Sequence, residues 1–215
     1  MSKPLKIDFV SDVSCPWCAI GLKSLEHALQ QVGDGISAEL HFQPFELNPQ
    51  MPAEGQDIVE HLTEKYGITP EQVQRNSDLI RERGESVGFE FRMERRNSVY
   101  NTFDAHRLLH WAELEGRQRE LKHALLRAYF TEGDNPASHE VLARLAGEAG
   151  LDVERARDVL ASGAYAEETR AQERFYLEQG IHSVPAVIIN DRYLISGGQP
   201  AEVFEQALRQ VAAQA

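Results

Sequence analysis

The sequence comprises 215 residues, of which 42% are hydrophobic, and its formal net charge is −12. A chain of this length can bury a sizeable apolar core as one domain, or as one domain with a large insertion, so it needs no covalent staple to fold. The net negative charge and the lack of a sustained basic run argue against electrostatic binding to nucleic acid or anionic lipid. We therefore expect neither nucleic acid nor membrane as a partner.

The N-terminus, MSKPLKIDFVSD, lacks the basic start, long apolar stretch and small-residue cleavage site of a secretory signal peptide. No apolar run approaches the roughly 18 to 20 residues that cross a bilayer. We therefore expect a soluble, cytoplasmic protein. Thiols are kept reduced in that compartment, so a C-x-x-C pair there is expected to be catalytic or metal-binding rather than a permanent disulfide.

The first fifty residues carry a strand–helix–strand pattern. Residues 5–10 are short and rich in β-branched and aromatic side chains, which favours a strand. A helix is predicted over 15–32, because its apolar residues recur near helical spacing and Gly33 follows. Residues 36–47 alternate well enough to predict a second strand. Two strands joined by one helix form a βαβ crossover.

The long interval that follows is predicted to be almost wholly helical. Gly150, Gly163 and Gly180 stand where C-terminal helix caps belong. The expected helices cover 56–66, 70–87, a segment with an apolar stripe of Ala105, Leu108, Leu109 and Ala112, and then 117–132, 138–149, 153–162 and 165–179.

The last thirty-five residues are expected to complete a sheet. Strands are predicted at 186–190 and 193–196, joined by a two-residue turn, and a helix after Pro200 carries apolar residues at helical spacing. The predicted fold class is therefore α/β, with the order β-α-β, a helical interval, then β-β-α. We expect a sheet domain from 1–51 and 181–215, with an inserted helical domain at 52–180.

The only two cysteines, Cys15 and Cys18, lie in the stretch DVSCPWCAIG, after a strand and at the start of a helix. The N–H groups and positive dipole end at that position favour thiolate over thiol, so Cys15 is the candidate nucleophile. Cys18, one turn along, can attack a mixed disulfide formed by Cys15. Pro16 suits the first helical turn. Trp17 is predicted to cover the sulfurs or line a substrate surface, with plain packing as the alternative.

A second feature lies 170 residues downstream in HSVPAVIIN. A proline directly before an apolar strand is awkward as a ladder member, and a cis Val184–Pro185 bond would turn the chain there. Position alone leaves the isomer open, because cis X-Pro bonds make up only about 5 to 6% of X-Pro bonds in folded proteins.

Four stretches, DVSCPWCAIG, NTFDAHRLLHWA, LLRAYFTEG and GIHSVPAVIINDRYLISGGQPAEVFEQAL, together resemble the DsbA-type thioredoxin-fold family. The closest likeness is to its cytoplasmic FrnE-like branch, described as dithiol-disulfide isomerases. The resemblance spans nearly the whole chain and implies a thioredoxin-like domain with a large all-helical insertion. It also implies a dithiol-disulfide oxidoreductase or isomerase that needs no cofactor beyond its redox-active cysteine pair.

The resemblance assigns roles to individual residues. Cys15 corresponds to the nucleophile and Cys18 to the resolving thiol, while Val184–Pro185 corresponds to a cis peptide that packs against the disulfide. The Val184 backbone would then pair with an extended substrate segment, and the Pro185 ring would shield the sulfurs. The partners implied are a disulfide-containing protein or a small thiol, and the chain is expected to be a monomer or homodimer.

Relatives of this type often carry a buried carboxylate on the first strand that moves a proton to or from the second cysteine. Asp8 is the nearest match, although its loop to the first cysteine is one residue longer than in the periplasmic type. Asp12 is the substitute candidate. A structural or loop role is the alternative for both.

Histidines raise further hypotheses. His106 and His110 share one helix face, which allows a zinc site with the two cysteines, although both flank an apolar stripe where polar residues are ordinary. The resemblance places Asn101 and His106 toward the active-site cleft as candidate substrate contacts. His182 lies two residues before Val184 and could support the thiolate, with an exposed loop position as the alternative.

A different activity on the same fold is the main alternative. Residues 196–200, SGGQP, precede the last helix, where backbone amides could bind the carboxylate of a small thiol. Kappa-class glutathione transferases and 2-hydroxychromene-2-carboxylate isomerases share this fold, use glutathione and place serine at the first motif position. Here that position is Cys15, which favours thiol–disulfide exchange and leaves glutathione as a candidate co-substrate.

Overall fold

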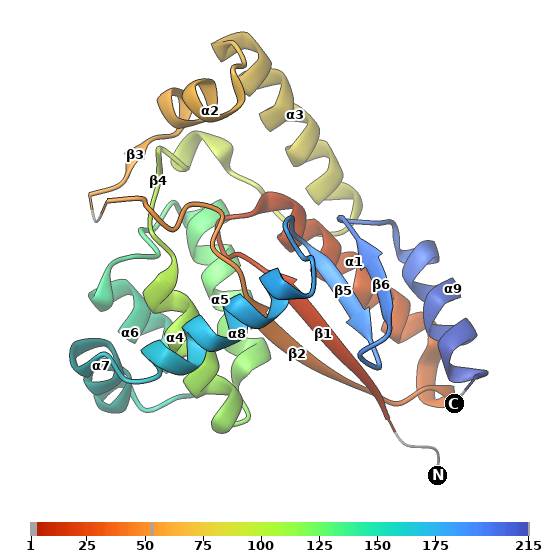
Figure 1. The fold of residues 1–215 in the computed structure, drawn as a ribbon. Coiled ribbons are helices and arrows are strands. Elements are labelled where there is room, and N and C mark those ends of the chain that lie inside the picture. Colours follow the sequence, from red (N-terminus) through yellow and green to blue (C-terminus); the bar gives the residue numbers. More distant parts are fainter. Residues whose placement is uncertain (1–3, 53, 215) are drawn as a thin grey trace.

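The computed structural model describes residues 4–52 and 54–214, and a four-stranded sheet lies at its centre (Figure 1). Its strand order is β2-β1-β5-β6, with β1 parallel to β2 and antiparallel to β5. The strands of this sheet are β1 (Leu5–Ser11), β2 (Ala38–Pro44), β5 (Ala186–Ile189) and β6 (Tyr193–Ser196). A second, two-stranded sheet pairs β3 (Gln56–Asp57) with β4 (Ser98–Val99).

Helices make up most of the remaining described chain. They are α1 (Pro16–Val32), α2 (Ile58–Tyr66), α3 (Pro70–Ser86), α4 (Phe103–Leu114), α5 (Gln118–Arg127), α6 (His139–Glu148), α7 (Val153–Ser162), α8 (Ala166–Glu178) and α9 (Ala201–Ala212). Short helical turns are η1 (Gly33–Gly35), η2 (Met93–Arg95) and the π-helical η3 (Ala128–Glu132). Within the described residues, no helix combines the length and the apolar character that a membrane span requires.

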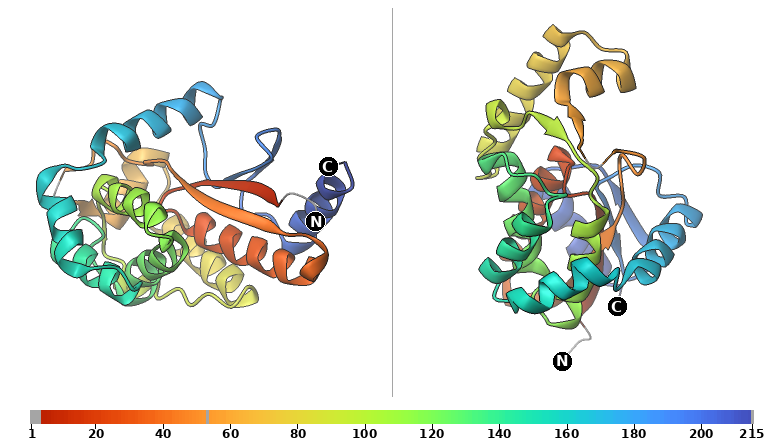
Figure 2. Two further views of the ribbon diagram at one scale, coloured as in Figure 1. Left: turned by 90° about the horizontal axis from the view of Figure 1, so that it is seen from below. Right: turned by 90° about the vertical axis from the view of Figure 1, so that its left-hand side faces the viewer.

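The central sheet is covered on both faces, with α1 and α9 on one side and α8 on the other (Figure 2). Both faces need covering because the side chains of strand β1 alternate between them and are apolar on each. Ile7 and Phe9 are fully buried in the core shared with α1 and α9. Val10 is buried on the opposite face with Tyr176 and Ile181. The central strand therefore reads as a nearly continuous apolar run.

Helices α4 to α7 lie beyond the β2 edge of the sheet and enclose a core of their own (Figure 1). The core beneath the sheet also takes in Ile80, Phe91 and Phe130 from the helical interval. One apolar cluster thus joins side chains from both predicted segments. The division into a sheet domain and an inserted domain at 52–180 stays a prediction.

Most predicted elements are present, and the differences lie at their ends. Residues 56–57 are not the start of a helix, because they pair with β4 and α2 begins only at Ile58. The predicted strand 36–47 ends at Pro44, since the chain then leaves the sheet and the Leu47 N–H binds the side chain of Asp12.

The helix expected at 117–132 ends at Arg127 and continues as the π-helical turn η3. At the hairpin, β5 stops at Ile189, and Asn190 and Asp191 adopt positive φ angles of 52° and 57°. Both residue types tolerate this conformation, which explains why the turn begins one residue before its predicted position.

Gly84 is buried inside α3 because the helix lies close to the segment that follows it. A Cβ at this position would lie 2.6 Å from the carbonyl oxygen of Phe89 and would also meet the Phe91 ring. Alanine gains about 1 kcal/mol of helix propensity over glycine, but the overlap costs about 1 to 3 kcal/mol.

We therefore expect Gly84→Ala to lower the free energy of unfolding, measured by urea denaturation. Gly35→Ala is the matched control, because a Cβ added to Gly35 would meet no other atom within 4 Å. Equal or higher stability of Gly84→Ala would contradict the close approach of α3.

Candidate active site

The two cysteines lie at the N-terminus of α1, as predicted. Cys15 is the N-cap residue, with extended backbone angles φ −91° and ψ 114°, and Pro16 occupies the first helical position. The Cys15 carbonyl accepts the Cys18 N–H at 3.1 Å, which closes the first turn and brings the two side chains to the same side. Neither cysteine is in a disulfide.

The two cysteines are buried, and their pKa values are shifted in opposite directions. Cys15 is 4% exposed and Cys18 is fully buried. A hydrogen bond from the Cys18 thiol lowers the pKa of Cys15; burial opposes this, and the Cys18 and Trp17 N–H groups assist it, for a net lowering. Burial, followed by the same hydrogen bond, raises the pKa of Cys18 well above its ordinary value. Cys15 is therefore the more readily ionised of the two thiols, and Cys18 the less readily ionised.

The Val184–Pro185 corner lies directly against the first cysteine. Its peptide bond is cis, which confirms that prediction. The Cys15 Sγ lies 3.8 Å from the Val184 carbonyl oxygen. Within the described part of the chain, no backbone hydrogen bond engages the Val184 N–H. This N–H is therefore free to donate a hydrogen bond to a further strand.

Two glycines allow the corner to pack this closely on α1. A Cβ on Gly21 would lie 3.2 Å from both the Pro185 ring and the Gly198 Cα, and one on Gly198 would lie 2.9 Å from the Trp17 carbonyl oxygen. The Gly197 N–H donates to the Pro185 carbonyl at 2.8 Å. The turn before α9 is thus held against both the helix and the proline corner.

Asp12 is buried beneath the cysteine loop and organises it. Its Oδ1 accepts the Ser14 N–H at 3.2 Å, and its Oδ2 accepts the Leu47 N–H at 2.7 Å. The His106 Nε2 lies 3.5 Å from Oδ1, which is longer than an ordinary hydrogen bond. Burial alone would raise the pKa of Asp12, but His106 and the two N–H donors bring it below its ordinary value.

Asp8, the other candidate carboxylate, is buried on the α8 face of β1, between residues that point toward α1. Its Oδ1 accepts a hydrogen bond from the Gln43 side chain at 2.7 Å, and its Oδ2 lies 2.9 Å from Lys6 Nζ. The structure therefore brings Asp12, and not Asp8, to the cysteines.

The remaining predicted residues lie in different surroundings. The Asn101 side chain, just before α4, accepts the Phe103 N–H at 2.9 Å. His106 is buried against Asp12, and His182 is exposed. His110 contacts Gln172 at 3.2 Å. No three His, Cys, Asp or Glu side chains among residues 4–52 and 54–214 form a metal-binding group, so the zinc alternative gains no support.

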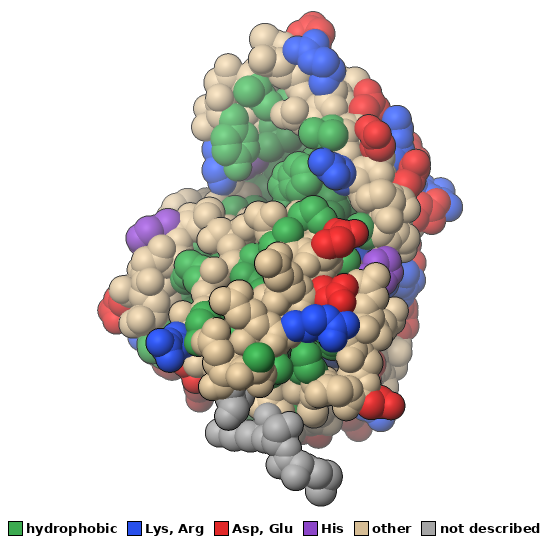
Figure 3. Space-filling view, turned by 90° about the vertical axis from the view of Figure 1, so that its right-hand side faces the viewer, with side chains coloured by type: hydrophobic (Ala, Val, Ile, Leu, Met, Phe, Trp, Pro, Cys, Tyr) green, Lys and Arg blue, Asp and Glu red, His purple; other side chains and the backbone are tan. Residues whose placement is uncertain are grey.

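A cavity of about 460 Å³ adjoins the motif on its outer side. Trp17 is 37% exposed and lines it, together with the buried Ser24, the basic residues His27 and Arg83, and residues 198–202, where the turn leads into α9. In the space-filling view, hydrophobic side chains gather around the hollow between the upper α2–α3 pair and the body of the molecule (Figure 3). Trp17 thus lines an open surface beside the sulfurs.

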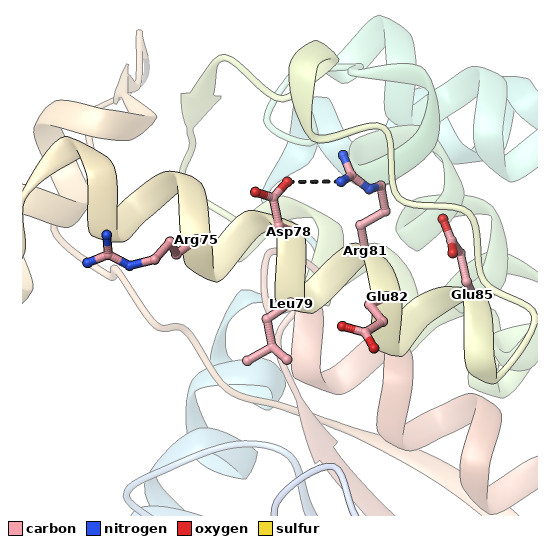
Figure 4. Close-up of a pocket in the computed structure, with 6 residues that line it drawn as sticks. All are labelled: Arg75, Asp78, Leu79, Arg81, Glu82 and Glu85. Atoms are coloured by element: carbon pink, nitrogen blue, oxygen red, sulfur yellow. Dashed lines mark hydrogen bonds and ion pairs between the residues drawn. The ribbon is translucent and has the colours of Figure 1, made fainter.

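Another hollow, of about 590 Å³, follows the outer face of α3. Its lining residues all belong to this one helix, and five of the six are charged (Figure 4). Asp78 and Arg81 are paired with each other at 2.9 Å. We regard this hollow as a solvated helix face with no role in the site.

Two residues near the cysteines escaped the sequence analysis. Lys122 of α5 is fully buried, and its charge interacts with those of Cys18, Asp12 and Cys15. Burial and the charge of Cys15 raise the pKa of Tyr66 at the end of α2. The sequence could have pointed to Lys122, because this charged residue stands four residues after Gln118 on the apolar stripe of its helix.

Comparison with known proteins agrees with this geometry. A family model described as a DsbA-like thioredoxin domain matches residues 6–209. An uncharacterized protein of Bacillus subtilis strain 168, YwbO, is 29% identical over 203 residues, which is 94% of each chain.

Solved structures give the same result. A structure titled as a probable DsbA oxidoreductase from Streptomyces coelicolor has a TM-score of 0.91 and 38% identity, over 98% of this chain and 91% of that one. The cytosolic disulfide reductase DsbM from Pseudomonas aeruginosa, titled as a structure with GSH, has a TM-score of 0.65 and 20% identity, over 97% and 99%. A 2-hydroxychromene-2-carboxylate isomerase has a TM-score of 0.68 and 16% identity, over 97% of each chain. The last two show the fold alone.

Replacing Asp12 with asparagine tests its role in the loop. The amide oxygen can accept one of the two N–H groups but the amide nitrogen cannot accept the other, so we expect Asp12→Asn to lower the free energy of unfolding by about 1 to 3 kcal/mol at pH 7. The folded-state pKa is lowered, so this stabilisation is present above the ordinary value of 3.8 and is lost as the pH falls below it. Urea denaturation at several pH values should show that the difference in free energy of unfolding between wild type and variant becomes smaller in acid. A difference that does not depend on pH would refute this role.

Removing the Cys18 thiol tests the asymmetry of the pair. We expect Cys18→Ala to raise the pKa of Cys15, because the hydrogen bond that lowers it most is lost. Cys18→Ser is the matched control, since its hydroxyl can still donate. The pKa is measured from the pH dependence of Cys15 alkylation, and an unchanged value in Cys18→Ala would contradict the assignment.

Proposed function

The chain belongs to the DsbA-like thioredoxin domain family, and we propose that it is a cytoplasmic dithiol-disulfide oxidoreductase or isomerase that acts through its C-P-W-C motif. The observation that carries this proposal is the buried C-x-x-C pair at the start of α1, with Cys15 lying against the Val184–Pro185 corner; in this setting the pKa of Cys15 is lowered and that of Cys18 is raised. A nucleophile must be ionised at rest, whereas a resolving thiol must wait for the mixed disulfide.

The reaction follows from this arrangement. The Cys15 thiolate attacks one sulfur of a substrate disulfide, forms a mixed disulfide and expels the other substrate sulfur as a thiolate. Cys18 then loses its proton and attacks the Cys15 sulfur, which forms the Cys15–Cys18 disulfide and releases the second substrate thiolate. The substrate gains two electrons and the cysteine pair loses them, so the pair itself is the redox group. The reverse sequence oxidises a dithiol.

The surroundings of the pair support a substrate with an extended or flexible disulfide segment. The free Val184 N–H lies beside Cys15 and can pair with the backbone of such a segment. Trp17 and the adjoining cavity offer apolar area on the other side. We propose a disulfide-containing protein or a small disulfide as substrate, with the chain acting as a monomer or homodimer.

Glutathione is our candidate for the small thiol that regenerates the pair. The likeness to the structure of DsbM with GSH motivates this choice, as does the N-terminus of α9 after Pro200, because a helix N-terminus favours a carboxylate. A glutathione-dependent isomerase or transferase is the second candidate, because a 2-hydroxychromene-2-carboxylate isomerase shares the fold. The presence of Cys15 and Cys18, rather than a single hydroxyl, favours disulfide exchange.

The test is reduction of insulin, or refolding of a scrambled disulfide protein, by the wild type and two variants. We expect Cys15→Ser to reduce the rate to the uncatalysed background, because the nucleophile is lost. Cys18→Ser should instead accumulate a mixed disulfide on Cys15, visible by mass spectrometry. Full activity in Cys15→Ser would exclude the proposal, and glutathione-dependent turnover that survives Cys18→Ser would favour the isomerase or transferase.

A further inference from the structure

Lys122 is the most unusual buried side chain near the cysteine pair. It lies on α5, is fully buried, and its Nζ has no hydrogen-bond partner among the described residues. The amine lies over the ring of Phe42 on β2, 5.8 Å from the ring centroid. An isolated ammonium in such surroundings is strongly destabilised, so the group must be neutral or be balanced by a nearby anion.

The position of Lys122 is fixed by the packing of α5 on the sheet. Gln118, one turn earlier, accepts the Phe42 N–H at 2.8 Å and donates to the Phe42 carbonyl at 3.0 Å. Leu126, one turn later, is buried in the same apolar core as both cysteines. The lysine is therefore held on the inner face of α5, on the side of the sheet where the cysteines lie.

Three titratable groups exert a charge on the Lys122 amine when they are ionised. They are the Cys18 and Cys15 thiols at the start of α1 and the Asp12 carboxylate in the loop before it. Burial lowers the pKa of Lys122, and the negative charge that each of these groups carries when ionised acts in the opposite direction, that of Cys18 most strongly. Reciprocally, Lys122 opposes the rise in the pKa of Cys18. The ionisation of Cys18 and the protonation of Lys122 therefore favour each other.

We propose that Lys122 is the buried proton acceptor and counter-charge for Cys18 in the resolving step. This inference rests on the proposed function. It gives Lys122 the part expected of a first-strand carboxylate, a part that Asp8 cannot take because it lies on the opposite face of the sheet.

The step balances as follows. In the mixed disulfide, the Cys18 thiol gives its proton to the neutral Lys122 amine and becomes a thiolate paired with an ammonium. The thiolate forms the Cys15–Cys18 bond, the bond between Cys15 and the substrate sulfur breaks, and the substrate leaves as a thiolate. The ammonium, now without its counter-ion, returns the proton to solvent. Lys122 Nζ has no hydrogen-bond partner among the described residues of the reduced protein, so the transfer requires the lysine stem to move toward Cys18.

The experiment follows the two steps separately with the aromatic disulfide dithiobis-nitrobenzoate. Attack by Cys15 releases a first equivalent of thionitrobenzoate, and resolution by Cys18 releases the second. For Lys122→Met we expect the first phase to change by less than about twofold and the second phase to slow by about tenfold or more at pH 7, which corresponds to about one unit in the pKa of Cys18. The second phase of the variant should also keep rising with pH to more alkaline values than in the wild type.

Two controls separate this role from a structural one. Lys23→Met makes the same change on a lysine that is partly exposed on α1 and should leave both phases unchanged. Lys122→Met should unfold in urea at the same or a higher denaturant concentration, because it removes an unpaired buried amine. If Lys122→Met misfolds, Lys122→Gln, which keeps a polar group that cannot accept the proton, is measured in its place with the same expectation.

A second phase of wild-type rate and pH profile in a folded Lys122 variant would overturn the inference. Equal slowing of both phases would also overturn it, because Lys122 would then act through Asp12 and the cysteine loop rather than on Cys18. Failure of the proposed function is distinguishable, because the wild type itself would then show no rapid first phase at Cys15.

Discussion

The interaction between the side chains of Cys15 and Cys18 is the one on which the site depends. It is the largest influence that lowers the pKa of Cys15, and it also raises the pKa of Cys18. The same interaction thus favours ionisation of Cys15, the nucleophile, and disfavours ionisation of Cys18, the resolving thiol. The helix supplies the geometry, because a C-x-x-C pair at its first turn places both side chains on one side.

The fold surrounds this contact with elements that leave it little freedom. Asp12 ties the loop before the helix to the segment after β2. Gly21 and Gly198 allow the Pro185 corner and the turn before α9 to lie within contact distance of α1. The cysteines are consequently buried, yet the Val184 N–H and the exposed edge of Trp17 remain on either side of them. Such an arrangement suits a reaction in which the substrate, rather than the enzyme, must adapt its shape.

The sequence predicted the elements and the cysteine pair because these follow from local patterns: strand composition, helical spacing and glycine caps. Strand alternation also held the information that Asp8, between buried Ile7 and Phe9, faces away from the cysteines. Lys122 could have been flagged as a polar residue on an apolar helix stripe. Its nearness to Cys18 could not, because it depends on how α5 packs against β2, a contact between segments far apart in the sequence.

The most direct test is a titration of the reduced wild-type protein in which the Cβ carbons of both cysteines are followed separately by nuclear magnetic resonance. The account predicts that Cys15 ionises with a midpoint below the ordinary value of 9.0, while Cys18 remains a thiol well above it. Two cysteines that titrate together near the ordinary value, or Cys18 ionising first, would contradict it.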